Sequence, residues 1–281
     1  MKKIAVVLGC FLFFLQGSAQ TVDEIIAKYE AVSGGRDKLM AIKNLEIFGN
    51  LKLDMMGQSM EIPLTLIQEK GKLFRRQVGG IMGMGDSFTM LTDSSGIVFI
   101  PPIRGFGGRG PDGGGFGGGF GSQSEPTIIR MQPDEINSQQ YELNCDGPFP
   151  DLVNYAAKGS TAELAGTGKV NKAPCYKVLL TLKTGQKITY YIDQQNFLVK
   201  QMEATGEMAA NLTGLGSLMK AVGTNVRKDT KASITVKEYK AFEGIQFPVK
   251  YTLNFGPVES EVENTTIKVN QGIEAKWYLV R

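Results

Sequence analysis

The chain contains no histidine at all and only three cysteines among its 281 residues. The absence of histidine excludes Ser-His-Asp and Cys-His catalysis and most catalytic zinc sites. Three cysteines are too few for a disulfide scaffold or a cysteine-rich zinc site. No pair of carboxylates stands in a recognisable catalytic frame either. We therefore expect no enzyme, no catalytic residue, no metal and no cofactor.

The sequence also lacks a strong charge and a second long apolar run. The formal net charge is only +3, which does not indicate a nucleic-acid partner. Hydrophobic residues make up 42% of the chain, enough for a proper core. We expect one β domain over residues 20–281, soluble or peripheral to a membrane.

The N-terminus has the layout of a secretory signal peptide. Lys2 and Lys3 precede an apolar run over Ile4–Leu15, and small residues follow up to Ala19. The run is shorter than the roughly 20 residues that a membrane-spanning helix needs. We expect cleavage after residue 19, with export to the periplasm. The alternative, lipidation at Cys10, would leave half of the apolar run on the mature protein.

Beyond Thr21 the pattern predicts one helix and then mostly strands. Thr21 and Glu24 form a capping box for a helix that ends near Val32, and Arg36–Ile42 predicts a further short turn of helix. Alternation of apolar and polar residues predicts strands over residues 45–54, 60–66, 72–78, 176–183, 187–192, 198–204, 232–239, 247–255 and 258–269. Short turns between them favour antiparallel pairing. The remaining helices are expected at Pro133–Leu143 and Asp151–Ala157. The fold class is therefore mainly β (α+β), a curled antiparallel sheet with a few helices covering its concave face.

Two segments interrupt the succession of strands. Residues 101–126 are dominated by glycine, and their match to a dinucleotide-binding motif lacks the required strand and helix, so we expect a surface loop. We expect Gly105–Ser122 to be dispensable for folding, because ordering glycine costs the most backbone entropy. Residues 206–230 predict a helical hairpin whose apolar residues recur at helical spacing. These residues form a candidate lid: Met208, Leu212, Leu215 and Met219.

Residues that share the alternation phase within each strand should lie on one face of the sheet. This inward face is the candidate ligand-lining surface: Leu51, Leu53, Ile62, Leu64, Leu66, Val178, Leu180, Val249, Tyr251 and Leu253. A few short helices cannot cover so broad a face tightly, so a hydrophobic ligand or the lid should shield it. Methionines such as Met202 and Met208 serve either an adaptable binding surface or ordinary core packing. Cys145 and Cys175 are expected to be free, although one disulfide between them is an alternative.

Several motifs, in order, resemble the outer-membrane lipoprotein-sorting protein family, the LolA-like periplasmic carriers, in a Bacteroidetes-type form. The resemblance begins at Tyr29–Leu39 and continues through Asp146-Gly147-Pro148 and Pro174–Val178 to Tyr190–Asp193 and Gly244–Pro248. It implies an unclosed antiparallel β-barrel, with helices on one side and a hydrophobic cavity between.

The resemblance also implies a function. It is that of a periplasmic carrier, with hydrophobic ligands or lipoprotein acyl chains as its partners. The alternative is a scaffold or accessory subunit at the outer membrane that uses its sheet to hold an envelope protein. A cavity lined by apolar side chains favours the carrier, and a filled core favours the scaffold.

Overall fold

The computed structural model describes residues 20–55, 58–80, 85–102, 125–214, 226–256 and 258–280. Its centre is a single antiparallel sheet of 13 strands, in the order β6-β5-β4-β3-β2-β1-β13-β12-β11-β10-β9-β8-β7. The edges β6 and β7 are at opposite ends of this order, so the sheet is not closed. The predicted fold class is confirmed.

The strands account for most of the described chain. They are, in chain order, β1 (Asn44–Met55), β2 (Gln58–Glu69), β3 (Leu73–Val78), β4 (Ser87–Leu91), β5 (Gly96–Ile100), β6 (Thr127–Arg130), β7 (Thr161–Val170), β8 (Ala173–Thr181), β9 (Lys187–Asp193), β10 (Val199–Thr205), β11 (Lys231–Phe242), β12 (Ile245–Phe255) and β13 (Val258–Val269). Successive strands pair as hairpins, and the pairing of β1 with β13 joins the first six strands to the last seven.

Within the described residues, the helices are short. They are α1 (Val22–Val32), α2 (Arg36–Met40), α3 (Pro133–Gln139), α4 (Glu207–Thr213) and the 3-10 turns η1 (Gln140–Leu143), η2 (Tyr155–Lys158) and η3 (Ala275–Tyr278). The capping box predicted for the first helix is confirmed, since Thr21 and Glu24 exchange side-chain-to-backbone hydrogen bonds of 3.2 Å.

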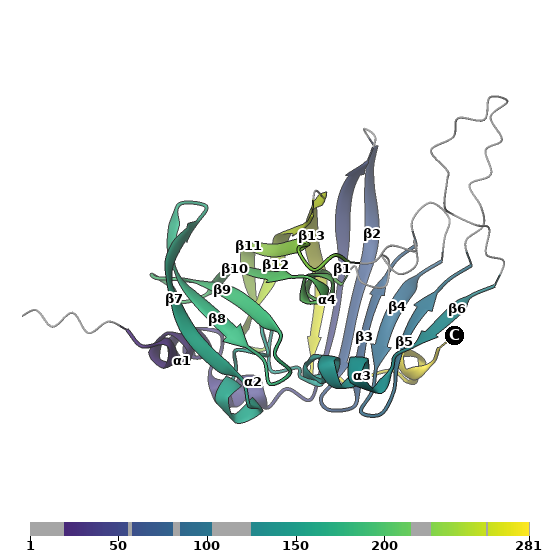
Figure 1. Ribbon diagram of the computed structural model, residues 1–281, viewed down its shortest axis with the longest axis horizontal. Helices are drawn as coiled ribbons and strands as arrows, with labels where there is room; N and C mark the ends of the chain where they lie inside the picture. The colour runs from purple at the N-terminus through teal and green to yellow at the C-terminus, as the bar shows by residue number, and fades with distance from the viewer. Residues whose placement is uncertain are drawn as a thin grey trace, which may run out of the picture.

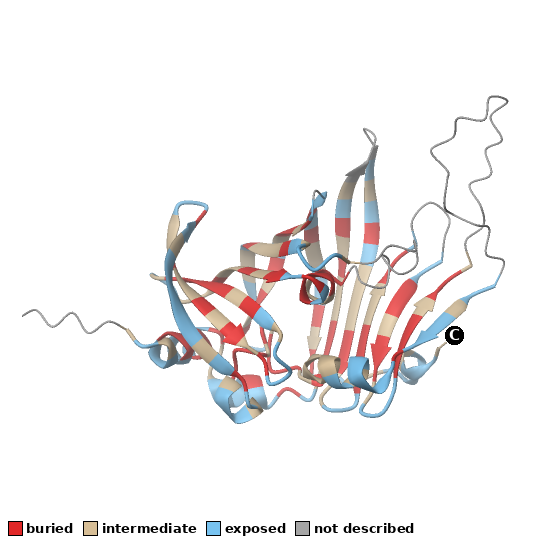
Figure 2. Ribbon diagram, viewed as in Figure 1, coloured by how far each residue is buried: buried red, intermediate tan, exposed pale blue. Residues whose placement is uncertain are grey.

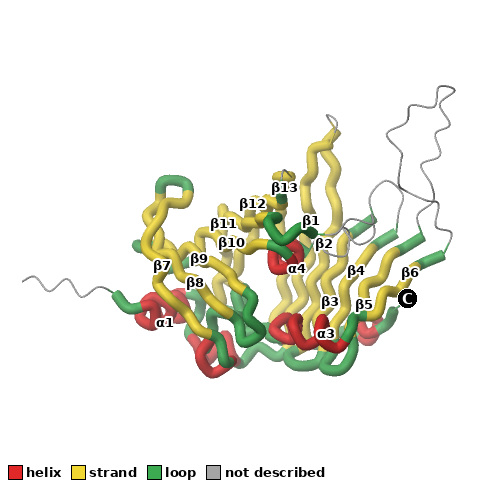
Figure 3. The backbone as a smooth tube through the Cα atoms, in the orientation of Figure 1, coloured by secondary structure: helices red, strands yellow, loops and turns green. Residues whose placement is uncertain are grey.

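The sheet curls into two walls (Figure 1), one built from β1–β6 and the other from β7–β12. Helix α4 lies between the walls, and α1 and α2 lie at one end of the sheet. In Figure 3 the strands form the bulk of the tube, with the helices gathered mainly along that same end. The largest cluster of buried residues joins Ile25, Ile26 and Tyr29 of α1 to the inner face of β8–β12.

The outer face of the first wall is also covered, which the sequence did not predict. The C-terminal strap, defined as Ile273–Val280, packs there through Trp277 onto a buried cluster that includes Ile67 and Phe88. Arg75 is buried between the rings of Phe88 and Trp277, and it donates hydrogen bonds to the carbonyls of Trp277 (3.2 Å) and Leu279 (2.6 Å). By contrast, the edge strands β6 and β7 are largely exposed (Figure 2).

One local prediction was wrong and another is confirmed. Residues Asp151–Ala157 do not form an α-helix. Turns lead into η2 instead, because Asn154 adopts a left-handed conformation (φ 50°) that ends regular helix.

The prediction for the cysteines is confirmed, since Cys145 and Cys175 are free and buried in different clusters. The expected signal peptide (residues 1–19) and Gly105–Ser122 lie outside the described residues.

Candidate functional site

The inner face of the sheet and α4 line a partly open cavity of about 200 Å³. Leu64 and Leu66 of β2 line one side, and Tyr251 and Leu253 of β12 line another. Met208 of α4 contributes from between the walls. Apolar side chains make up most of this lining, so the site suits a hydrophobic occupant more than a polar one.

Helix α4 closes part of the cavity and is held by polar contacts with β3 and with Tyr141 of η1. Arg76 of β3 donates a hydrogen bond from Nη1 to the backbone carbonyl of Asn211. Asn211 Nδ2 donates to the hydroxyl of Tyr141 at 3.2 Å, and that hydroxyl donates to Sδ of Met208 at 3.3 Å. A cation at a helix C-terminus is favourable because the last carbonyls carry partial negative charge. Of the candidate lid, Met208 and Leu212 therefore lie on an anchored helix.

One end of the cavity is polar. Arg76 Nη2 lies 3.8 Å from Oε2 of Glu142, and both side chains line the cavity together with Asp151 and Tyr190. Burial raises the pKa of Glu142 above its ordinary value. Burial, with Glu142 as a second cause, raises the pKa of Asp151 to about 7. The cavity thus combines a mainly apolar lining with two carboxyl groups whose pKa values are raised.

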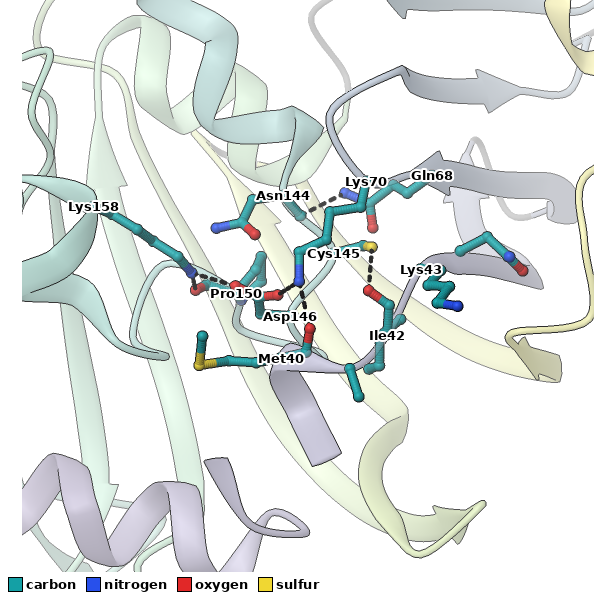
Figure 4. Close-up of polar contacts among 12 residues, drawn as sticks. Met40, Ile42, Lys43, Gln68, Lys70, Asn144, Cys145, Asp146, Pro150 and Lys158 are labelled. Atoms are coloured by element: carbon teal, nitrogen blue, oxygen red, sulfur yellow. Dashed lines mark hydrogen bonds and ion pairs between the residues drawn. The ribbon is translucent and has the colours of Figure 1, made fainter. Parts of the chain in front are cut away.

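Beneath this end, Asp146 binds two lysines (Figure 4). Its carboxylate oxygens lie 2.5 Å from Lys70 Nζ and 2.7 Å from Lys158 Nζ. The same lysines donate hydrogen bonds of 2.6 Å to the carbonyls of Met40 and Pro150. Asp146 therefore links the segment that connects the two walls to α2 and to the β2–β3 turn. This role is structural, because each lysine bridges the Asp146 carboxylate and a backbone carbonyl.

No protein-family model and no curated protein sequence matches the chain. Solved structures do match. A LolA superfamily protein from Nitrosomonas europaea superposes with a TM-score of 0.51 at 10% identity, covering 93% of this chain and 98% of that one. A DUF1329 family protein from Desulfovibrio piger also gives a TM-score of 0.51, at 9% identity, covering 91% and 97% of the two chains. The chain has a LolA-like fold.

Within this LolA-like fold, the sequence-predicted binding residues fall into three groups. Leu64, Leu66, Tyr251, Leu253, Met208 and Leu212 line the cavity. Leu51, Leu53 and Ile62 pack at the far end of the same face, in a cluster that includes Ala209 and Ala210 of α4. Val178, Leu180 and Val249 are buried in the main core. Leu215 and Met219 lie outside the described residues.

The polar residues of the site were missed from sequence. Arg76, Glu142 and Asp151 come from three separate stretches of the chain, so no spacing motif connects them. The Arg75–Arg76 pair was the only signal, because adjacent strand residues point to opposite faces and one of the two had to face inward. Arg76 is that residue.

The described residues contain no cluster of three or more His, Cys, Asp or Glu side chains that could hold a metal ion. Among the helices of the described ranges, none is long and apolar enough to cross a membrane.

Proposed function

We propose that the protein is an exported periplasmic carrier that binds hydrophobic ligands, above all lipid acyl chains, in the cavity beneath α4. The observation that supports this most is the cavity itself, which is lined mainly by apolar side chains. A tightly filled core is the usual outcome of folding, because voids forfeit dispersion contacts. An open apolar space under a short helix is therefore better explained as a place for a ligand. The LolA-like fold agrees with the carrier role that the sequence resemblance implies.

The size of the cavity sets a condition on this proposal. About 200 Å³ is below the roughly 300–1,000 Å³ of sites that enclose a whole drug-sized ligand. The cavity can therefore hold only part of one acyl chain unless α4 moves. Met208 and Met202 on its lining are flexible enough to repack around occupants of different shape.

Mass spectrometry of organic extracts tests the proposal directly. The protein is expressed with its signal peptide and purified from the periplasm without detergent. We expect lipids with long acyl chains in a defined ratio to protein, and a mature chain that begins at Gln20 and carries no covalent lipid. A Leu64→Phe variant, which fills the cavity, should copurify with less lipid. Lipid-free wild-type protein would contradict the carrier function.

One observation favours the second candidate, a scaffold for an envelope protein. Strand β6 is at an edge of the sheet, and Ile128 and Ile129 on it are 46% and 36% exposed. An exposed apolar edge strand can pair with an extended segment of a partner. Arg130→Pro on this strand should abolish such pairing without affecting lipid content.

A further inference from the structure

The carboxyl group of Asp151 has no hydrogen-bond partner among the residues that the structure describes, although the residue is only 8% exposed. It faces the cavity from the segment that follows Phe149. A buried carboxylate without a partner is costly, and native proteins rarely keep one without a function.

The nearby cations already have other protein partners. Lys158 is bound to Asp146 and to the carbonyl of Pro150. Arg76 donates to the carbonyl of Asn211 and is paired with Glu142. The cavity lining contains one basic side chain and two acidic ones. When both acids are ionised, the lining therefore carries a formal excess of one negative charge, located at Asp151.

We propose that Asp151 is a headgroup site, and that the cavity selects single-chain amphiphiles whose polar end is a hydrogen-bond donor, best a primary ammonium, over those with an ionised carboxylate. This inference rests on the proposed carrier function and adds the class of ligand. The alkyl chain lies along Leu64, Leu66 and Leu253, and the headgroup reaches Asp151 beside Tyr190. An ammonium would neutralise the negative charge of Asp151 and donate a hydrogen bond to its carboxylate. A carboxylate would meet Asp151 and Glu142, with Arg76 already bound to protein groups.

The charged groups around Asp151 agree with this assignment. Burial raises the pKa of Asp151 most, Glu142 and Asp146 raise it further, and Lys158 lowers it. A bound ammonium adds a positive charge at close range, so it should stabilise the ionised form and lower this pKa.

Displacement of a neutral fluorescent probe, N-phenyl-1-naphthylamine, tests the proposal at pH 8. The competitors are dodecylamine, dodecan-1-ol and dodecanoate, all below their micelle concentrations. We expect dodecylamine to displace the probe at a concentration at least tenfold lower than dodecanoate, with dodecanol between them, as one charge-assisted hydrogen bond implies. Asp151→Asn should reduce the ratio to threefold or less. Asp134→Asn, the same change at an exposed position on α3, should leave it unaltered.

The outcomes separate the two levels of the proposal. Equal displacement by all three competitors, or tighter binding of dodecanoate, would refute the headgroup site and leave the carrier function standing. Failure of the probe and every competitor to bind would refute the carrier function itself. The wild-type ranking decides the question even if Asp151→Asn does not fold.

Discussion

Gly214 makes room for Arg76 at the C-terminal end of α4. A Cβ built on Gly214 would overlap Cδ of Arg76, and the residue has a left-handed φ of +72°. This glycine ends the helix and lets the guanidinium reach the last carbonyls of α4. The position of the cavity's covering helix therefore depends on the absence of one side chain.

Gly214→Ala should loosen α4. The left-handed backbone alone costs about 1–2 kcal/mol for a residue with a side chain, and the overlap with Arg76 adds to this. Gly185→Ala is the matched control, because Gly185 also has positive φ (+88°) but open space around its Cβ position. We expect faster amide hydrogen exchange in α4 for Gly214→Ala only. Equal exchange in the two variants would show that the Arg76 contact does not hold the helix.

The C-terminal strap should detach when Arg75 is removed. Arg75→Met eliminates two hydrogen bonds to strap carbonyls and the stacking on Phe88 and Trp277, which together stabilise by roughly 2–4 kcal/mol. Trp277 is the single tryptophan of the chain, so its fluorescence reports on the strap. In urea, the fluorescence change should precede the loss of β circular dichroism in Arg75→Met. It should coincide with that loss in wild type and in Arg227→Met, an exposed control. Coincident transitions in all three proteins would refute the strap as a separate unit.

Stability should fall as pH rises through neutrality. The pKa of Asp151 is about 7 in the folded protein and ordinarily 3.8, so between these values the folded state holds a proton that the unfolded state has lost. Its contribution is fully present below about pH 4 and is lost as pH rises through 7. From pH 5 to pH 8 we expect the free energy of unfolding to drop by an amount on the order of a few kcal/mol. Asp151→Asn should flatten this slope, measured by urea denaturation. A wild-type profile that rises over the same range would contradict the assignment.

The glycine-rich segment should be dispensable for folding. Ile100 and Thr127 are paired across β5 and β6, so the ends that the segment connects are adjacent. Replacing residues 103–124 by a four-residue Gly-Ser linker should change the melting temperature by only a few degrees, because loop-closure entropy depends weakly on length. A Gly-Ser linker of the original length separates the effects of sequence and length. A fall of many degrees with both linkers would show that the segment contributes to the core.

The sequence predicted the strands that have one face exposed to solvent. The alternation of Phe247, Val249, Tyr251 and Leu253 with polar residues predicted β12, because most residues on the other side of that strand are half-buried or exposed. Strands β4 and β5 were missed because both of their faces are covered, by η1 and neighbouring residues inside and by the C-terminal strap outside. The apolar residues of β5 are continuous and β4 has only 5 residues, so neither strand shows a clear period of alternation. Strand β7 was missed for the opposite reason, since it is an exposed edge with little apolar content.

The apolar part of the candidate site was accessible from sequence and the polar part was not. Leu64 and Leu253 were predicted from alternation alone, since phase decides which face a residue occupies. Alternation does not determine which of the inward-facing residues along a strand reach the cavity. Leu51 and Val249 share the inward phase, yet they do not line the cavity, although other residues of their clusters do. The convergence of Arg76, Glu142 and Asp151 depends on how the sheet curls, and no local pattern encodes it.

Titration of the protein with a fluorescent acyl-chain ester that has an uncharged headgroup tests whether the cavity binds acyl chains. Leu64→Glu places a charge in the cavity, and Leu164→Glu places the same charge on β7, where Leu164 is 40% exposed. We expect saturable binding by wild type and by Leu164→Glu, and at least tenfold weaker binding by Leu64→Glu, because burying the introduced carboxylate against an acyl chain is unfavourable. Equal affinities for the two variants, or no saturable binding by the wild type, would contradict acyl-chain binding in the cavity.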